Sequence, residues 1–325
     1  MLDILVVIIF LAVLFDIANG WHDCANAIAT VVSTKVLSPA AAVTIAAIAN
    51  ILGAFFSTAV AKTIGKGIVD PSAVTNNVII AALLSAIIWN LITILMGLPV
   101  SSSHALVGGI IGAAAAHGGL SILNGDGILK IFLSLLISPV LGFIIGFAFM
   151  KLILVIFGGL APGVISKHFG RLQIVSSTFM AFGHGSNDAQ KAMGIITMAL
   201  LAAGKIPTLE VPTWVVLVCA LAMGFGTIFG GWKIIKTLGV KMLKLEPIHG
   251  FAAETSSAAI ILATSHFGLP VSTTHVVSTA ILGVGATKRL SAVRWGIAGK
   301  IVMAWILTLP FCIALAWGIL RLIEK

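Results

Sequence analysis

Long apolar segments fill most of this chain, and short polar phrases separate them. Five segments contain no Asp, Glu, Lys or Arg, and each is long enough to cross the hydrocarbon core of a bilayer, which takes roughly 20 residues. They are Pro39–Ala61, Pro71–Gly125, Val211–Trp232, Thr255–Thr287 and Ile301–Leu320. The second and the fourth are too long for one crossing, so we expect each to fold back or to hold a broken pair of helices. The run Leu2–Phe15 lacks a basic start and a cleavage site, which predicts a membrane helix instead of a signal peptide.

Two polar phrases occur twice, in the same order, in the two halves of the chain. The phrase GLPVSSSHALVGGIIG begins at Gly97, and GLPVSTTHVVSTAILG begins at Gly268, 171 residues later. The phrase GWHDCANA begins at Gly20, and GSNDAQKA begins at Gly185, 165 residues later. Repeats that interrupt apolar segments at corresponding places are typical of transporters that bind their substrate near the bilayer midplane.

The repeats divide the chain into residues 1–157, a linker at 158–169 and residues 170–325. A third match supports the division, because KTIGKGIVDP at Lys62–Pro71 resembles KTLGVKMLKLEP at Lys236–Pro247. The second of these loops is far more basic than the first, which favours halves inserted in opposite orientations. The sequence therefore predicts an all-α polytopic membrane protein with two inverted repeats, discontinuous or re-entrant helices and about ten to twelve membrane-embedded segments.

The Gly-Leu-Pro-Val-Ser phrases predict breaks followed by new half-helices. Pro99 and Pro270 disfavour helix just before them, so the preceding helices should end near Gly97 and Gly268. Ser101 and Ser272 are placed to cap the next helices, whose free N–H groups suit an anion. The hydroxyls that follow add hydrogen-bond donors for an oxyanion and oxygen atoms for a cation. They belong to Ser102, Ser103, Thr273 and Thr274.

Asp23 and Asp188 occupy matched positions in the other repeated phrase. A charged side chain at the bilayer centre costs about 2.5–3.5 kcal/mol on insertion scales, which makes both acids functional candidates. The alternative is that each caps a helix beginning at that residue. Their amide neighbours, Asn26, Asn187 and Gln190, favour the functional interpretation. We expect Asp23, Asn26, Asn187 and Asp188 to bind sodium, and Gln190 to contact the substrate.

Five further polar residues are candidates, and three of them leave two interpretations open. Lys191 replaces Asn26 in the second copy, and it either meets an anionic substrate or forms a structural ion pair with Asp188. His104 and His275 either bond phosphate or tie the hairpins to neighbours, and the second role is favoured because one His per copy seldom makes a metal site. Glu254 is a candidate coupling residue. Asp16 is expected to lie close enough to a helix end to reach water.

Composition agrees with a protein of the cell membrane. The 325 residues are 59% hydrophobic and 9% charged, with mean hydropathy +1.18. The net charge of +9 is distributed between apolar segments and forms no continuous patch, so no nucleic-acid partner is expected. Cys24, Cys219 and Cys312 show no metal-ligand spacing. The chain has no GxxxxGK[ST] phosphate loop, zinc spacing or catalytic triad context, which argues against an enzyme and an organic cofactor.

The phrases GWHDCANAIAT, GHGSNDAQKAMG, GLPVSSSH and GLPVSTTH resemble the duplicated signature of the inorganic phosphate transporter (PiT) family. The resemblance spans nearly the whole chain. It implies an inverted-repeat symporter, commonly a homodimer, that moves phosphate inward with sodium or protons. It also implies that the aspartate phrases and the Pro-x-Ser phrases form the site. One departure is His22, which stands where the family usually has Asn and where the second copy has Asn187.

Charge compensation suggests the mechanism. Phosphate beside two aspartates is repelled unless cations enter with it, so we expect sodium ions to bridge the carboxylates and the phosphate. Protons remain an alternative coupling ion, and a proton-coupled phosphate or metal-phosphate carrier, or a sulfate permease of the same fold, remains an alternative transporter. An anion channel or a phosphate receptor is less favoured, because neither needs paired anion and cation sites.

Overall fold

The computed structural model describes residues 2–69 and 74–325 and is almost entirely helical over those residues. Asp70 and Pro71 of the third repeated phrase lie outside the described residues. The first half contains α1 (Leu2–Ser33), α2 (Pro39–Gly53), α3 (Ala59–Gly67), α4 (Asn76–Met96), α5 (Ser102–Gly118), η2 (Leu120–Ile122) and α6 (Gly125–Phe157). The second half contains α7 (Pro162–Ala202), α8 (Thr213–Ile228), α9 (Trp232–Lys236), η3 (Thr237–Lys241), α10 (Pro247–His266), α11 (Thr273–Lys288), η4 (Leu290–Ala292) and α12 (Trp295–Ile323).

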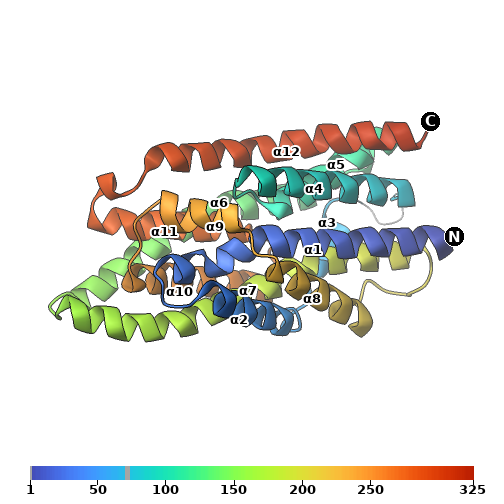
Figure 1. Cartoon of the computed structure of the whole chain (residues 1–325). Helices are drawn as coiled ribbons and strands as arrows, with labels where there is room; N and C mark the ends of the chain where they lie inside the picture. Colours follow the sequence, from blue (N-terminus) through green and yellow to red (C-terminus); the bar gives the residue numbers. More distant parts are fainter. Residues whose placement is uncertain (1, 70–73) are drawn as a thin grey trace.

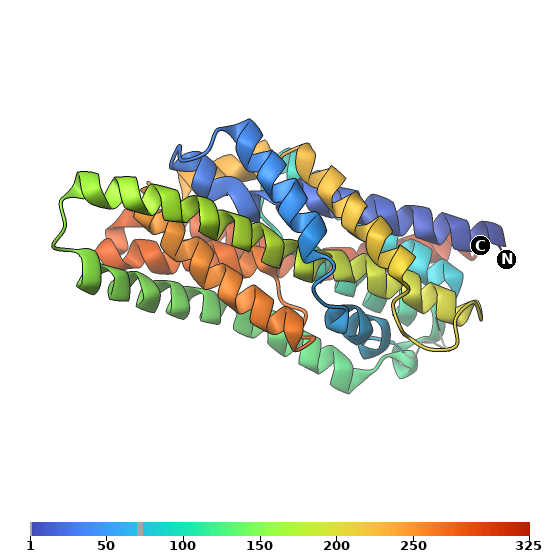
Figure 2. The same cartoon turned by 90° about the horizontal axis from the view of Figure 1, so that it is seen from below.

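The two halves repeat the same packing with their partners exchanged. Helix α1 packs on α8 as α7 packs on α2, α4 contacts α1 as α10 contacts α7, and α5 packs on α12 as α11 packs on α6. Corresponding helices also run in opposite directions, as α1 and α7 do in Figure 1. Helix α12 runs from left to right in Figure 1, whereas α6 runs from right to left in Figure 2, which is turned about the horizontal axis. The predicted all-α fold with inverted repeats is therefore confirmed.

Both long apolar segments break where the prolines predicted. Gly97 ends α4 with φ +69°, and Gly268 follows α10 with φ +69°, a conformation that an L side chain resists. The Ser101 and Ser272 side chains then accept hydrogen bonds from the backbone N–H groups of His104 and His275, so the predicted caps are confirmed. The resulting α5 and α11 have 17 and 16 residues, fewer than the roughly 20 that a typical crossing takes.

The third repeated phrase fastens each hairpin to the opposite half. Thr237 donates a hydrogen bond of 2.9 Å to the carbonyl oxygen of Gly97, and Thr63 donates one of 2.7 Å to the carbonyl oxygen of Gly268. Both carbonyls lie at the breaks, where the helix ladder leaves backbone groups without helical partners. The Lys-Thr phrases therefore have a structural role in closing the breaks.

The capping interpretation of the two aspartates is excluded, and most of the linker at 158–169 is helical. Helices α1 and α7 run through Asp23 and Asp188 without a break, so neither aspartate is a helix cap. The local phrases contain no proline, which permits the helix to continue. Helix α7 begins at Pro162, so only Gly158–Ala161 of the predicted linker is outside helices. The division into residues 1–157 and 170–325 itself stays a prediction.

By length and composition, fewer helices can cross a membrane completely than the roughly ten to twelve embedded segments that the sequence predicts. Among the described residues, four helices are long and apolar enough to span, α1, α4, α6 and α12, and the pair α8 with α9–η3, bent by 63°, makes a fifth. Helix α7 has 41 residues, yet it carries buried polar and charged side chains that lower its hydropathy. Short half-helices and polar helices can be embedded because neighbouring helices surround them.

The interior consists of two apolar clusters that meet at the aspartates. Helix α1 contributes residues up to Phe15 to the first cluster and residues from Cys24 onward to the second. Helix α7 contributes residues from Ala189 onward to the first and residues up to Ala181 to the second. The polar stretches that end at Asp23 and Asp188 therefore lie between the clusters, near the middle of the bundle.

Close helix contact depends on glycine at matched positions of α5 and α11. A Cβ atom built on Gly283 would lie 2.2 Å from the carbonyl oxygen of Phe143 in α6. We expect Gly283→Ala to lower the free energy of unfolding by about 1–3 kcal/mol, because overpacking moves backbone. Gly299→Ala, in open space on α12, is the matched control. Thermal denaturation of both variants in detergent measures the difference, and equal midpoints would contradict the packing argument.

Candidate functional site

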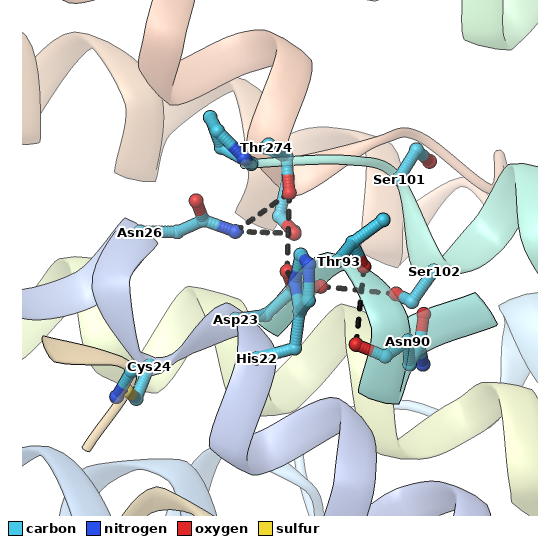
Figure 3. A network of polar contacts seen from close by, with 12 residues as sticks. His22, Asp23, Cys24, Asn26, Asn90, Thr93, Ser101, Ser102 and Thr274 are labelled. Atoms are coloured by element: carbon cyan, nitrogen blue, oxygen red, sulfur yellow. Dashed lines mark hydrogen bonds and ion pairs between the residues drawn. The ribbon is translucent and has the colours of Figure 1, made fainter. Parts of the chain in front are cut away.

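The N-terminal turns of α5 and α11 meet the middle of α1 and α7. Ser102 donates a hydrogen bond of 2.9 Å to Asp23 Oδ2, and Thr273 donates one of 3.3 Å to Asp188 Oδ2, so the repeat relates the two contacts. Thr274 also donates to Asp23 Oδ1 at 3.2 Å. Figure 3 shows Asp23 between Ser102 on one side and Thr274 on the other. Each aspartate is thus held by a capped half-helix.

Asn26 and Lys191 occupy the matched positions one turn beyond the aspartates. Asn26 Nδ2 donates to Thr274 Oγ1 at 2.9 Å and to Thr273 Oγ1 at 3.4 Å. Lys191 Nζ lies 2.8 Å from Ser102 Oγ and 3.0 Å from Asp188 Oδ2. The lysine therefore joins the acid of the second half to the half-helix of the first.

The two carboxylates lie close together with histidine neighbours. Asp23, His184 and Asp188 each offer one ligand atom, and these atoms lie within 4.8 Å of one another. Two carboxylate charges at that separation repel by roughly 3 kcal/mol or more at an effective dielectric constant of about 20. Lys191 offsets part of this repulsion, and His22 Nδ1 lies 2.7 Å from Asp23 Oδ1.

His184 was missed by the sequence analysis. Its Nε2 atom lies 3.3 Å from Asp188 Oδ2, and its Nδ1 atom lies 3.0 Å from the side-chain oxygen of Asn50. The signal that could have identified it is its place in the repeat, where it matches Asn19, another polar residue inside an apolar segment. Asn50 comes from α2, so only the folded chain brings it to the site.

Several buried atoms at the site have no hydrogen-bond partner among the described residues. They are both amide atoms of Asn187, Oδ1 of Asp188 and Nε2 of His22. Buried polar groups without a protein partner cost free energy unless a ligand, ion or water satisfies them. Carboxylate and amide oxygens suit a hard cation such as sodium, and the half-helix N-termini suit an oxyanion. The donor set therefore fits an anion bound together with a cation.

The site is closed from solvent in this conformation. Every predicted substrate and sodium residue is at most 3% exposed. A ligand can reach these side chains only if the surrounding helices move, as helices do in inverted-repeat transporters.

Not all predicted site residues meet at this point. Gln190 points to α3 and α10, where it accepts a hydrogen bond from Ala61 N and donates one to Ser265 Oγ. Ser103 donates to the carbonyl oxygen of Val271 at 3.3 Å and so ties the two hairpins together. The geometry gives Gln190 a structural role. Ser101 and Ser272 are used as helix caps.

His104 and His275 lie beside each other where the hairpins meet. Their ring centroids are 4.8 Å apart, and the ring of His275 stacks 3.9 Å from that of Trp305. Trp305 in turn donates a hydrogen bond of 2.8 Å to the carbonyl oxygen of Pro99. These contacts join α5, α11 and α12, which agrees with the structural interpretation of the two histidines.

Glu254 belongs to a separate buried cluster between α1, α7 and α10. Its carboxylate accepts hydrogen bonds from Thr30 at 2.5 Å, from Gln173 at 3.0 Å and from Ser176. No basic side chain forms an ion pair with it among the described residues. A buried carboxylate surrounded only by neutral donors is suited to hold a proton or a cation.

Asp16 differs from its expected position. The residue is 0% exposed, and neither carboxylate oxygen has a nitrogen or oxygen partner among the described residues. The expectation that it reaches water is wrong, because α8 packs against α1 beside it, where Gly226 approaches the carbonyl oxygen of Ile17.

Comparisons with known proteins extend over the same residues. A protein of Bacillus subtilis (strain 168) described as a probable low-affinity inorganic phosphate transporter is 49% identical over 329 residues, covering 99% of both chains. A protein of Rhizobium meliloti (strain 1021) with the same description is 47% identical over 94% of this chain and 92% of its own. A solved structure described as the sodium-dependent phosphate transporter is 27% identical and matches 99% of both chains with a TM-score of 0.91.

The profile of the phosphate transporter family matches this chain twice, at residues 19–161 and at residues 160–316. The two matches contain both copies of the repeated phrases, so the resemblance inferred from those phrases is confirmed. The prediction of a multi-pass protein of the plasma membrane that is not an enzyme is confirmed as well. This chain belongs to the phosphate transporter family.

Proposed function

We propose that this protein imports inorganic phosphate by symport with sodium. Phosphate would bind between the N-terminal turns of α5 and α11, where free N–H groups and the hydroxyls of Ser102, Thr273 and Thr274 converge. The observation that supports this proposal most directly is the meeting of two half-helix N-termini with two carboxylates within 4.8 Å of each other. An anion and a cation can then share one closed site.

Charge balance explains why transport would be coupled. The two aspartates repel phosphate, so the anion binds well only when a cation lies between them. The cation in turn is held by both the carboxylates and the phosphate oxygens. Because neither ion binds strongly alone, the two halves close only when cation and phosphate are bound together. The cation gradient can then drive the accumulation of phosphate.

Sodium is favoured by the oxygen atoms that the site offers. Asp23, the hydroxyl of Thr274 and the amides of Asn26 and Asn187 supply such oxygens, and the structurally similar protein is described as sodium-dependent. Proton coupling is the second candidate, and it is favoured by His22 and His184, which lie against the two aspartates. A proton-coupled metal-phosphate carrier or a sulfate permease of this fold would use the same donors.

Glu254 is proposed as a second coupling position. It lies on the same helix bundle but outside the central site, and it contacts α1 and α7 together. Since these two helices carry Asp23 and Asp188, a proton or cation at Glu254 would change the packing of both. The cluster could thereby couple ion binding to closure of the site.

The outer surface suits lipid and a second copy of the chain. In the most apolar stretches of α6 and α12 only 22% of the residues are buried. Large apolar side chains are exposed on these two helices, and they include Phe132, Val140, Val155, Ile306 and Phe311. We propose that lipid contacts most of this surface and that part of it forms a homodimer. Native mass spectrometry of protein released from nanodiscs measures the oligomeric state directly.

Uptake of labelled phosphate into proteoliposomes tests the coupling ion. We expect an inward sodium gradient to raise initial uptake about tenfold or more over potassium at equal pH, as expected when a coupling ion strengthens substrate binding by several-fold to a hundredfold. A pH gradient without sodium is the control. Equal uptake under both gradients would reject sodium coupling, and unlabelled sulfate as competitor would reveal a sulfate permease.

A further inference from the structure

We propose that Lys191 is a fixed cation that replaces one coupling ion at Asp188. The inference rests on the proposed function, because it concerns the number of cations that accompany phosphate. Its basis is geometric. The repeat places a neutral amide beside one aspartate and an ammonium group beside the other.

The matched contacts show what the lysine replaces. In the first half, Asn26 lies against the hydroxyls of Thr273 and Thr274, at the start of α11. In the second half, Lys191 Nζ makes the equivalent contact with Ser102 at the start of α5, and it also lies 3.0 Å from Asp188 Oδ2. A sodium ion bound to Asp188 Oδ2 and Ser102 Oγ would occupy the space that Nζ fills. The ammonium group is therefore placed where the symmetric arrangement would hold an ion.

Lys191 is buried within the candidate site. The side chain is 1% exposed, and its Nζ atom contacts Ser102 of α5 and Asp188 of α7. A buried charge needs a partner to offset the loss of hydration. Asp188 is that partner, and through Ser102 the lysine is also linked to Asp23, whose Oδ2 accepts from the same hydroxyl.

This arrangement makes the two halves unequal in ion binding. Asp188 is already compensated by a charge that cannot leave with the substrate, so a mobile cation is required only at Asp23. Transport would then move one cation fewer per phosphate than a site with an amide at both positions. With fewer cations moved per phosphate, each transport cycle dissipates less of the ion gradient. The phosphate gradient that the protein can build is then smaller as well.

Lys191→Asn, which copies the first half, tests the proposal. Purified wild type and variant are compared by thermal denaturation in sodium chloride and in N-methylglucamine chloride, and by phosphate uptake at varied sodium. We expect sodium to raise the melting temperature of Lys191→Asn more than that of wild type. We also expect sodium-free uptake to fall about tenfold and the Hill coefficient for sodium to rise by about one, as for one added coupled site. Lys191→Arg, which keeps the charge, should retain the wild-type sodium order.

The outcomes separate this inference from the proposed function. If Lys191→Asn shows no larger sodium stabilisation and an unchanged sodium order, the fixed-cation role is rejected even when wild type is a coupled transporter. If only the KM for phosphate rises, Lys191 is a substrate ligand and the proposal is rejected too. If wild type accumulates phosphate without any cation gradient, the proposed function is rejected. The effect of sodium on the melting temperature of Lys191→Asn still tests the fixed-cation role in that case.

Discussion

Asp23→Asn is expected to reduce gradient-driven phosphate uptake by roughly 100-fold or more while leaving the protein folded in the membrane. The substitution removes the charge that would hold a mobile cation, and a 100-fold loss corresponds to about 3 kcal/mol of lost ion and substrate binding. The amide oxygen can still accept a hydrogen bond from Ser102 or Thr274, which now bond the carboxylate. The measurement is initial uptake of labelled phosphate at matched protein density.

The matched control is Asp126→Asn. Asp126 is exposed in the first turn of α6, so its loss should leave uptake close to that of wild type. Thermal denaturation of both variants separates loss of function from loss of fold. Uptake by Asp23→Asn within a few-fold of wild type, at normal stability, would show that this carboxylate does not take part in coupling.

Glu254→Gln is expected to abolish net accumulation while retaining phosphate exchange. The carboxylate accepts from Thr30, Gln173 and Ser176, so an amide would present a donor where three donors already converge. It could no longer bind a proton or hold a cation by charge, yet the central site would be unchanged. Net accumulation is measured under a cation gradient, and exchange is measured with phosphate on both sides.

Glu210→Gln is the control for this position, because Glu210 is exposed before α8. A purely structural role for Glu254 predicts that exchange and accumulation fall together with thermal stability. If both activities are instead unchanged in Glu254→Gln, the residue has no part in coupling. A selective loss of accumulation is the result that supports the proposal.

The sequence determined the repeats, the helix breaks and the capping residues, because these depend on local chemistry. In each Gly-Leu-Pro-Val-Ser phrase a glycine of positive φ and a proline end one helix, and the serine caps the helix that follows. The pairing of Asp23 with Asp188 could also be predicted, since the repeat places both at the same level. At the aspartates the local pattern left capping as an alternative, and only the structure shows that α1 and α7 continue through Asp23 and Asp188.

Only the tertiary structure decided which polar residues share the site. Lys191 meets Ser102 of the other half, and Asn50 reaches His184 from α2. Gln190 lies next to Lys191 in sequence but points to α3 and α10, because successive residues of a helix face different directions. The spacing of residues in the sequence predicts which side chains share one face of a helix. Which residues of other helices they contact depends on how the two halves pack. That packing brings Asn26 to the hydroxyls of α11, and it brings Lys191 to Asp188 and to the hydroxyl of Ser102 in α5.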